Sequence, residues 1–167
     1  MLAVDPLGAV GDGGLALFEA ALQARTPEAD WQRAHELDER AMRGEGQPGE
    51  AVESLRLLWP AYFPDRDGAP PMPDMRMSLK AYSGVFASML ASLPTLEASL
   101  PTISVPVGVV AGAQSPIPPE QAAVATARVI PGAWVEVVEG AGHFPWLDRP
   151  GSVRAALDRL AAQVTTS

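Results

Sequence analysis

The sequence predicts an α/β fold with a short parallel sheet of about three strands and an inserted block of helices. Three observations support this prediction. A short apolar run stands at residues 2–4, amphipathic helical patterns fill residues 14–100, and strand and helix patterns alternate after residue 101. Because continuously apolar strands joined by helices are typical of a parallel sheet covered on both faces, the last third should form a βαβ unit.

The first strand is expected at Leu2-Ala3-Val4, where Asp5-Pro6 ends the apolar run. A glycine-rich turn follows from Gly8 to Gly14. A helical pattern then begins near residue 15, with apolar side chains recurring on one face.

The middle of the chain is predicted to be helical between glycine and proline boundaries. One helix should begin at Pro27, with Thr26 as its N-cap, and end at Gly44. Two further helices are expected over residues 48–60 and 78–93, separated by a proline-rich stretch.

The last third should contain two strands and two helices. The first strand is expected at residues 103–111, followed by a helix over 120–129 and a second strand over 134–139. Pro150 should precede a final amphipathic helix.

Composition excludes several classes of function. The 12 basic residues are scattered and the net charge is −8, so a nucleic-acid surface is not expected. No apolar run reaches the roughly 18–20 residues of a membrane helix. The absence of cysteine excludes thiol catalysis and thiolate metal sites, and it fits a cytoplasmic location.

His143 is a candidate general base because it follows the apolar run that ends at Glu139. The other histidine, His35, stands four residues before Glu39 on a predicted helix. That spacing could suit a metal, but a solvated helix face is the preferred interpretation.

The last third of the chain resembles the C-terminal part of the α/β-hydrolase fold. The resemblance is carried in order by the runs at 105–112, 115–118, 130–133, 140–145 and 149–150. It implies that the first run is the seventh strand of that fold and that His143 is the catalytic histidine after the eighth strand.

The resemblance also implies a division of the chain. Residues 1–13 would be the sixth strand and turn of the core, residues 14–100 a helical cap, and residues 101–167 the C-terminal core with the histidine loop. Four aromatic residues would line the substrate pocket: Trp31, Trp59, Phe86 and Phe144.

The sequence departs from the family in two ways. The nucleophile motif Gly-x-Ser-x-Gly does not occur, and in the family it precedes the sixth strand. We therefore expect a truncated chain, inactive alone, whose sheet a preceding segment or a partner chain would complete. Ser115 also stands where the family usually has its catalytic Asp, so Asp5 becomes the expected acid, with Glu139 and Asp148 as alternatives.

The resemblance implies a Ser-His-Asp hydrolase acting on an ester or amide of a small molecule, without a metal or organic cofactor. A different hypothesis is a degenerate hydrolase remnant that acts as a non-catalytic binding module.

Overall fold

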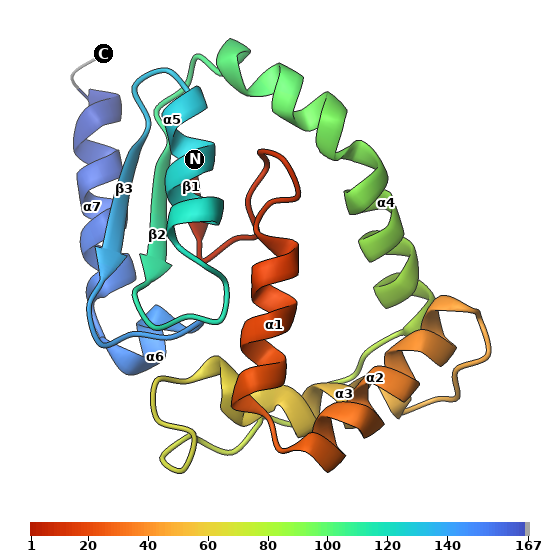
Figure 1. Ribbon diagram of the computed structural model, residues 1–167. Coiled ribbons are helices and arrows are strands. Elements are labelled where there is room, and N and C mark those ends of the chain that lie inside the picture. Colours follow the sequence, from red (N-terminus) through yellow and green to blue (C-terminus); the bar gives the residue numbers. More distant parts are fainter. Residues whose placement is uncertain (166–167) are drawn as a thin grey trace.

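A computed structural model describes residues 1–165 and contains one sheet of three parallel strands (Figure 1). The strands are β1 (Leu2–Val4), β2 (Gly108–Gly112) and β3 (Trp134–Val138), and their order is β1-β2-β3. The predicted α/β class with a short parallel sheet is therefore confirmed.

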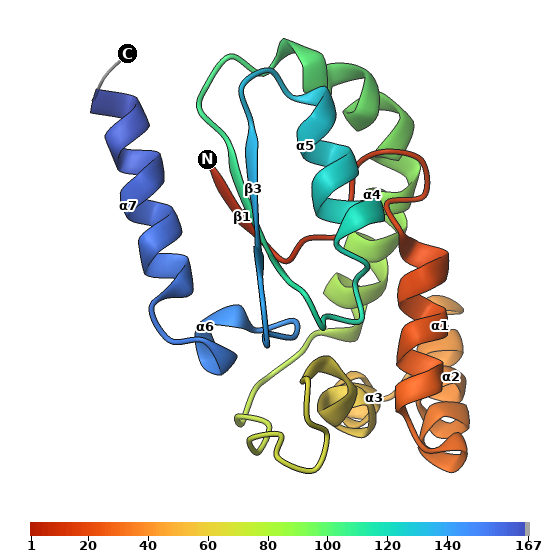
Figure 2. The ribbon, with the colours of Figure 1, turned by 60° about the vertical axis from the view of Figure 1, so that its left-hand side comes forward.

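Helices cover both faces of this sheet, as Figure 2 shows. Val109 and Ala127 belong to one cluster of buried apolar side chains, on the face covered by α5 (Ala125–Val129). Val110 and Ala156 belong to a second cluster, under α7 (Ser152–Thr165). Successive residues of β2 thus point into opposite cores, which explains why every residue of this central strand is apolar or glycine and buried.

Strand β2 is shorter than the sequence predicted. A strand was expected from residue 103, but residues 100–102 form a 3₁₀ turn and Val105 is exposed. Pro106 has no N–H to donate to a neighbouring strand, so regular pairing begins at Gly108. At Gly108 the ring of Trp134 occupies the place where a Cβ would be, which makes glycine necessary there.

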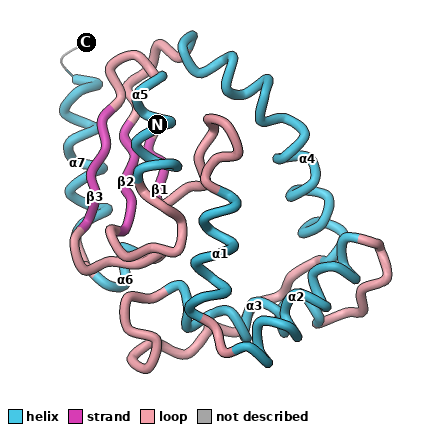
Figure 3. The backbone as a smooth tube through the Cα atoms, in the orientation of Figure 1, coloured by secondary structure: helices cyan, strands magenta, loops and turns pink. Residues whose placement is uncertain are grey.

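The helices between β1 and β2 form the middle of the chain (Figure 3). They are α1 (Leu15–Arg25), α2 (Glu28–Met42), α3 (Glu50–Leu58), a 3₁₀ turn (Trp59–Tyr62) and α4 (Leu79–Ser99). Helices α2 and α3 pack together, and α4 leads from them back to the sheet (Figure 1). The division at residues 13 and 100 stays a prediction.

Two predicted helix boundaries are wrong. Thr26 does not cap α2, because its hydroxyl donates a 2.7 Å hydrogen bond to the carbonyl oxygen of Leu22 in the preceding helix. Helix α2 therefore begins at Glu28. Pro94 lies inside α4, which ends at Ser99 rather than at residue 93. The helix expected over residues 48–60 corresponds to α3, which ends at Leu58, and Pro60 lies in the 3₁₀ turn that follows it.

Two shorter elements complete the fold. A π-helical turn (Glu120–Val124) leads into α5, and α6 (Pro145–Asp148) follows the histidine loop. Among residues 1–165, no helix combines the length and the apolar character required to cross a bilayer.

Candidate active site

Three polar side chains meet at the carboxyl end of the parallel sheet. Asp5 directly follows β1, Ser115 lies in the loop after β2, and His143 lies in the loop after β3. Neighbouring parallel strands end at the same edge, so residues far apart in sequence come together there.

Asp5 contacts His143 directly. Its Oδ2 lies 2.7 Å from Nδ1 of the imidazole, across 138 positions of sequence. The side chain of Asp5 is 1% exposed, whereas that of His143 is 26% exposed. The carboxylate is therefore held inside the protein while the ring reaches the surface of the site.

The carboxylate of Asp5 accepts two further hydrogen bonds. The N–H of Gly112 donates to Oδ1 at 2.9 Å, and the hydroxyl of Ser115 donates to Oδ2 at 2.5 Å. Oγ of Ser115 also accepts from the N–H of Ile117 at 3.0 Å, which fixes the hydroxyl's direction. A buried carboxyl group needs such donors because water does not reach it.

The backbone of Asp5 has an uncommon conformation. Its φ is 43°, the one positive value outside glycine among the described residues. Aspartate tolerates this left-handed region better than most residues. The N–H of Asp5 still donates to Val110 at 2.6 Å, so the chain turns sharply at the end of β1 while it stays attached to β2. Backbone strain of this kind is concentrated at functional sites.

The loop that carries His143 is packed tightly against the 3₁₀ turn after α3. The N–H of His143 donates to the carbonyl oxygen of Tyr62 at 2.8 Å. A Cβ on Gly142 would overlap that same oxygen, so glycine is required before the histidine. The pairing of Gly142 with His143 thus has a steric cause.

The two alternative acids are placed differently. Oδ2 of Asp148 accepts from the N–H of Gly142 at 2.8 Å, so Asp148 holds the histidine loop through its backbone. Glu139 accepts from Nε of Arg149 at 3.0 Å through its carbonyl oxygen. Of the three candidate acids, Asp5 is the one that the structure places against the imidazole.

A cavity of about 650 Å³ adjoins His143. Trp59 and Phe144 line it, and their ring centroids are 4.9 Å apart. The other lining side chains are mostly apolar as well: Leu55, Tyr62, Pro70, Pro71, Pro73, Met75, Trp146 and Leu147. The imidazole therefore faces a space suited to an apolar group.

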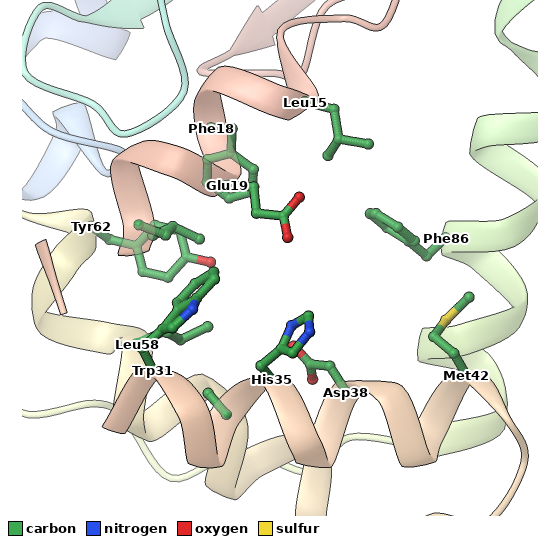
Figure 4. A pocket seen from close by; sticks show the side chains of 12 residues that line it. Leu15, Phe18, Glu19, Trp31, His35, Asp38, Met42, Leu58, Tyr62 and Phe86 are labelled. Atoms are coloured by element: carbon green, nitrogen blue, oxygen red, sulfur yellow. The ribbon is translucent and has the colours of Figure 1, made fainter. Parts of the chain in front are cut away.

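Trp31 and Phe86 do not line this cavity. They lie around a second space of about 250 Å³ between α1, α2 and α4 (Figure 4). Tyr62 lines both cavities. The four aromatic residues that the sequence grouped in one pocket are thus divided between two.

Sequence reasoning missed the hydrogen bond from Ser115 to Asp5. Ser115 stands at the expected acid position, but its partner lies 110 positions away in the sequence.

His35 forms an exposed ion pair with Glu39, with Nε2 and Oε1 3.4 Å apart. The described residues hold no group of three or more His, Asp or Glu side chains that could bind a metal.

No protein-family model matches the chain, and no curated protein shows a significant match. Among solved structures, the chain is similar to the crystal structure of a bromoperoxidase from Bacillus anthracis. That comparison has a TM-score of 0.44 and 16% sequence identity, and it covers 94% of this chain. The chain spans about half of the length of that structure, at 51% coverage.

Proposed function

We propose that this chain carries the base and the acid of an α/β-hydrolase active site of the Ser-His-Asp type. The observation that supports this proposal is the 2.7 Å contact between buried Asp5 and His143, at the wall of an apolar cavity. The reaction would be hydrolysis of an ester or amide of a small molecule.

His143 acts as the general base in this proposal. Because its Nδ1 faces a carboxylate oxygen, Nδ1 carries the proton and Nε2 is left free to accept one. Nε2 would take the hydroxyl proton of a serine as the serine oxygen attacks the acyl carbon. The resulting imidazolium, stabilised by Asp5, would then give that proton to the leaving group.

Asp5 acts as the orienting acid. The N–H of Gly112 and the hydroxyl of Ser115 donate to the buried carboxylate and hold it in position against the imidazole. Ser115 therefore occupies the family's acid position and supports an acid on the neighbouring strand.

The nucleophile would come from a segment or partner chain that pairs with β1. The sequence holds no Gly-x-Ser-x-Gly motif, and β1 pairs with β2 along one edge while no described strand pairs with its other edge. A further parallel strand on β1 would end beside Asp5, because parallel strands end at a common edge. That position is within reach of the imidazole.

The substrate would be small and largely apolar. Trp59 and Phe144 line the cavity beside the imidazole and would contact the acyl group. Trp31 and Phe86 line the second cavity and are not part of this acyl site.

The test uses the protein combined with a segment or partner chain that supplies the Gly-x-Ser-x-Gly motif. Turnover of p-nitrophenyl acetate should be abolished by His143→Ala. Asp158→Asn, at an exposed acid paired with Arg154 on α7, serves as the control and should leave turnover unchanged. Unchanged turnover in His143→Ala would refute the assignment of the base.

A further inference from the structure

The cavity between α1, α2 and α4 combines aromatic rings with carboxylates. Four aromatic side chains line it: Phe18, Trp31, Tyr62 and Phe86. Figure 4 shows them on opposite sides of the space, with Phe86 reaching in from α4 and the other three standing across from it. Organic cations are attracted to the faces of aromatic rings, and here one face of Trp31 is stacked on His35 while the other rings surround the space.

Two carboxylates lie in the wall of this cavity. Glu19 projects from α1 into the space, and Asp38 lies across from it on α2 (Figure 4). Among the residues that the structure describes, no lysine or arginine lines this cavity. His35 also stands in the wall beside Asp38 (Figure 4), stacked on Trp31 with ring centroids 6.0 Å apart, and its Nε2 lies 3.4 Å from Oε1 of Glu39.

Asp38 is held in an environment that disfavours its charge. Burial raises the pKa of this carboxyl above its ordinary value, while a hydrogen bond with Ser54 and the nearby His35 favour the charged form. A cation in the cavity would offset the cost of burying this carboxylate, since opposite charges attract more strongly at a partly buried site than in bulk water.

We propose that this cavity binds a small organic cation, an aryl- or alkylammonium group. The rings of Trp31 and Phe86 would contact its methyl or aryl groups, and Glu19 and Asp38 would balance its charge. The inference does not depend on the proposed hydrolysis, because this cavity shares one lining residue, Tyr62, with the cavity at His143.

The experiment is a calorimetric titration of the whole chain with benzyltrimethylammonium. The matched control ligand is neopentylbenzene, in which a carbon replaces the nitrogen and removes the charge without changing the shape. The cation should bind at least about ten-fold more tightly than the neutral compound. Equal affinities, or no binding of the cation, would overturn the proposal.

Variants locate the binding site. Glu19→Gln and Asp38→Asn should each weaken binding of the cation by about five-fold, since each removes one balancing charge. Glu36→Gln is the control, because Glu36 lies on the same helix as Asp38 with a 68% exposed side chain outside the cavity. If Glu36→Gln weakened binding as much as Glu19→Gln and Asp38→Asn do, the cation would be attracted by the net negative charge of the chain and not by this cavity. That result would refute the proposed site.

Glu19 gives the safer of the two acidic variants, because its side chain is exposed and its replacement should not disturb folding. Trp31→Leu should weaken binding of the cation more than binding of neopentylbenzene, since leucine keeps an apolar surface but removes the ring face. If Trp31→Leu left the ratio of affinities for benzyltrimethylammonium and neopentylbenzene unchanged, the ring of Trp31 would have no role in binding the cation. Because no ester is turned over in these titrations, their failure would leave the hydrolase proposal untouched.

Discussion

Ser115 donates its hydroxyl proton to Oδ2 of Asp5, the same oxygen that contacts the imidazole of His143. The two contacts measure 2.5 Å and 2.7 Å. Ser115 therefore does not take the place of a carboxylate in this site. Its hydroxyl holds the carboxylate of Asp5, which follows the end of β1.

Replacing Ser115 by Ala should destabilise the chain by about 1–3 kcal/mol, because a buried carboxylate would lose a donor that no water can replace. Urea unfolding followed by circular dichroism measures this change in the free energy of unfolding. The control is Ser92→Ala on α4, where an exposed hydroxyl donates within its own helix and its loss should matter by less than about 0.5 kcal/mol. Equal effects of the two substitutions would contradict the supporting role of Ser115.

Replacing Asp5 by Asn should reverse the tautomer of His143. The N–H of Gly112 cannot become an acceptor, so the amide oxygen of Asn must face it and the amide NH₂ must face the imidazole. Nδ1 would then have to accept this hydrogen bond and Nε2 would carry the proton, so that under the proposed function Nε2 could no longer accept a proton from a nucleophile. Asn also tolerates the positive φ at this position, so the backbone should be preserved.

Nitrogen NMR of the imidazole measures this switch directly in the chain as it stands. The Nδ1–H tautomer is expected in the original chain and the Nε2–H tautomer in Asp5→Asn. If the proposed hydrolysis is correct, the same substitution should lower turnover in the assembled protein by roughly 10⁴-fold, the loss known for a serine protease whose triad acid becomes Asn. An unchanged tautomer in Asp5→Asn would argue against the orienting role of Asp5.

Much of the sheet could be predicted from the sequence, because its strands are short apolar runs between strong turn signals. The strand at residues 2–4 agrees with the structure, and the one expected at 134–139 ends one residue earlier. The start of β2 could not be predicted, since apolar residues continue upstream and the pattern does not show that Pro106 interrupts the pairing.

The meeting of Asp5 and His143 was expected from the resemblance, but the details of the site depend on tertiary contacts. The hydrogen bond from Ser115 and the close approach of Gly142 to Tyr62 link segments that are distant in sequence. The positions of the aromatic residues also depend on tertiary contacts that the sequence does not reveal. Their helical spacing predicts which face of each helix is apolar, but not that Trp31 and Trp59 face different cavities.

Replacing Gly142 by Ala should displace the histidine loop. The new Cβ would overlap the carbonyl oxygen of Tyr62, and the backbone hydrogen bond from His143 to that oxygen would lengthen or break. We expect a loss of about 1–3 kcal/mol in the free energy of unfolding, as for other overpacked sites.

Gly84→Ala is the matched control for that substitution. Gly84 lies within α4, and a Cβ there would meet no atom within 4 Å. Alanine should therefore stabilise the chain by about 0.5–1 kcal/mol through helix propensity. Thermal or urea unfolding of the two variants should give shifts of opposite sign. A stabilising Gly142→Ala would show that the loop can move without cost.

The pH dependence of stability should report the burial of Asp38. Burial raises the pKa of Asp38 above its ordinary value of 3.8, so the folded chain holds this proton more tightly than the unfolded chain does. As the pH rises from about 4, the unfolded state loses the proton first, and the contribution of Asp38 to stability falls until the folded state has also released it. Asn at this position has no proton to lose.

The free energy of unfolding of Asp38→Asn, relative to that of the original chain, should therefore increase as the pH is raised above about 4. Urea unfolding at a series of pH values measures this difference. Ser54→Ala should make the decline of the original chain steeper, because the hydrogen bond with Ser54 favours the charged carboxylate and its removal would raise the pKa of Asp38 further. A difference between Asp38→Asn and the original chain that stays constant with pH would mean that the carboxyl group is as well solvated in the folded chain as in the unfolded one.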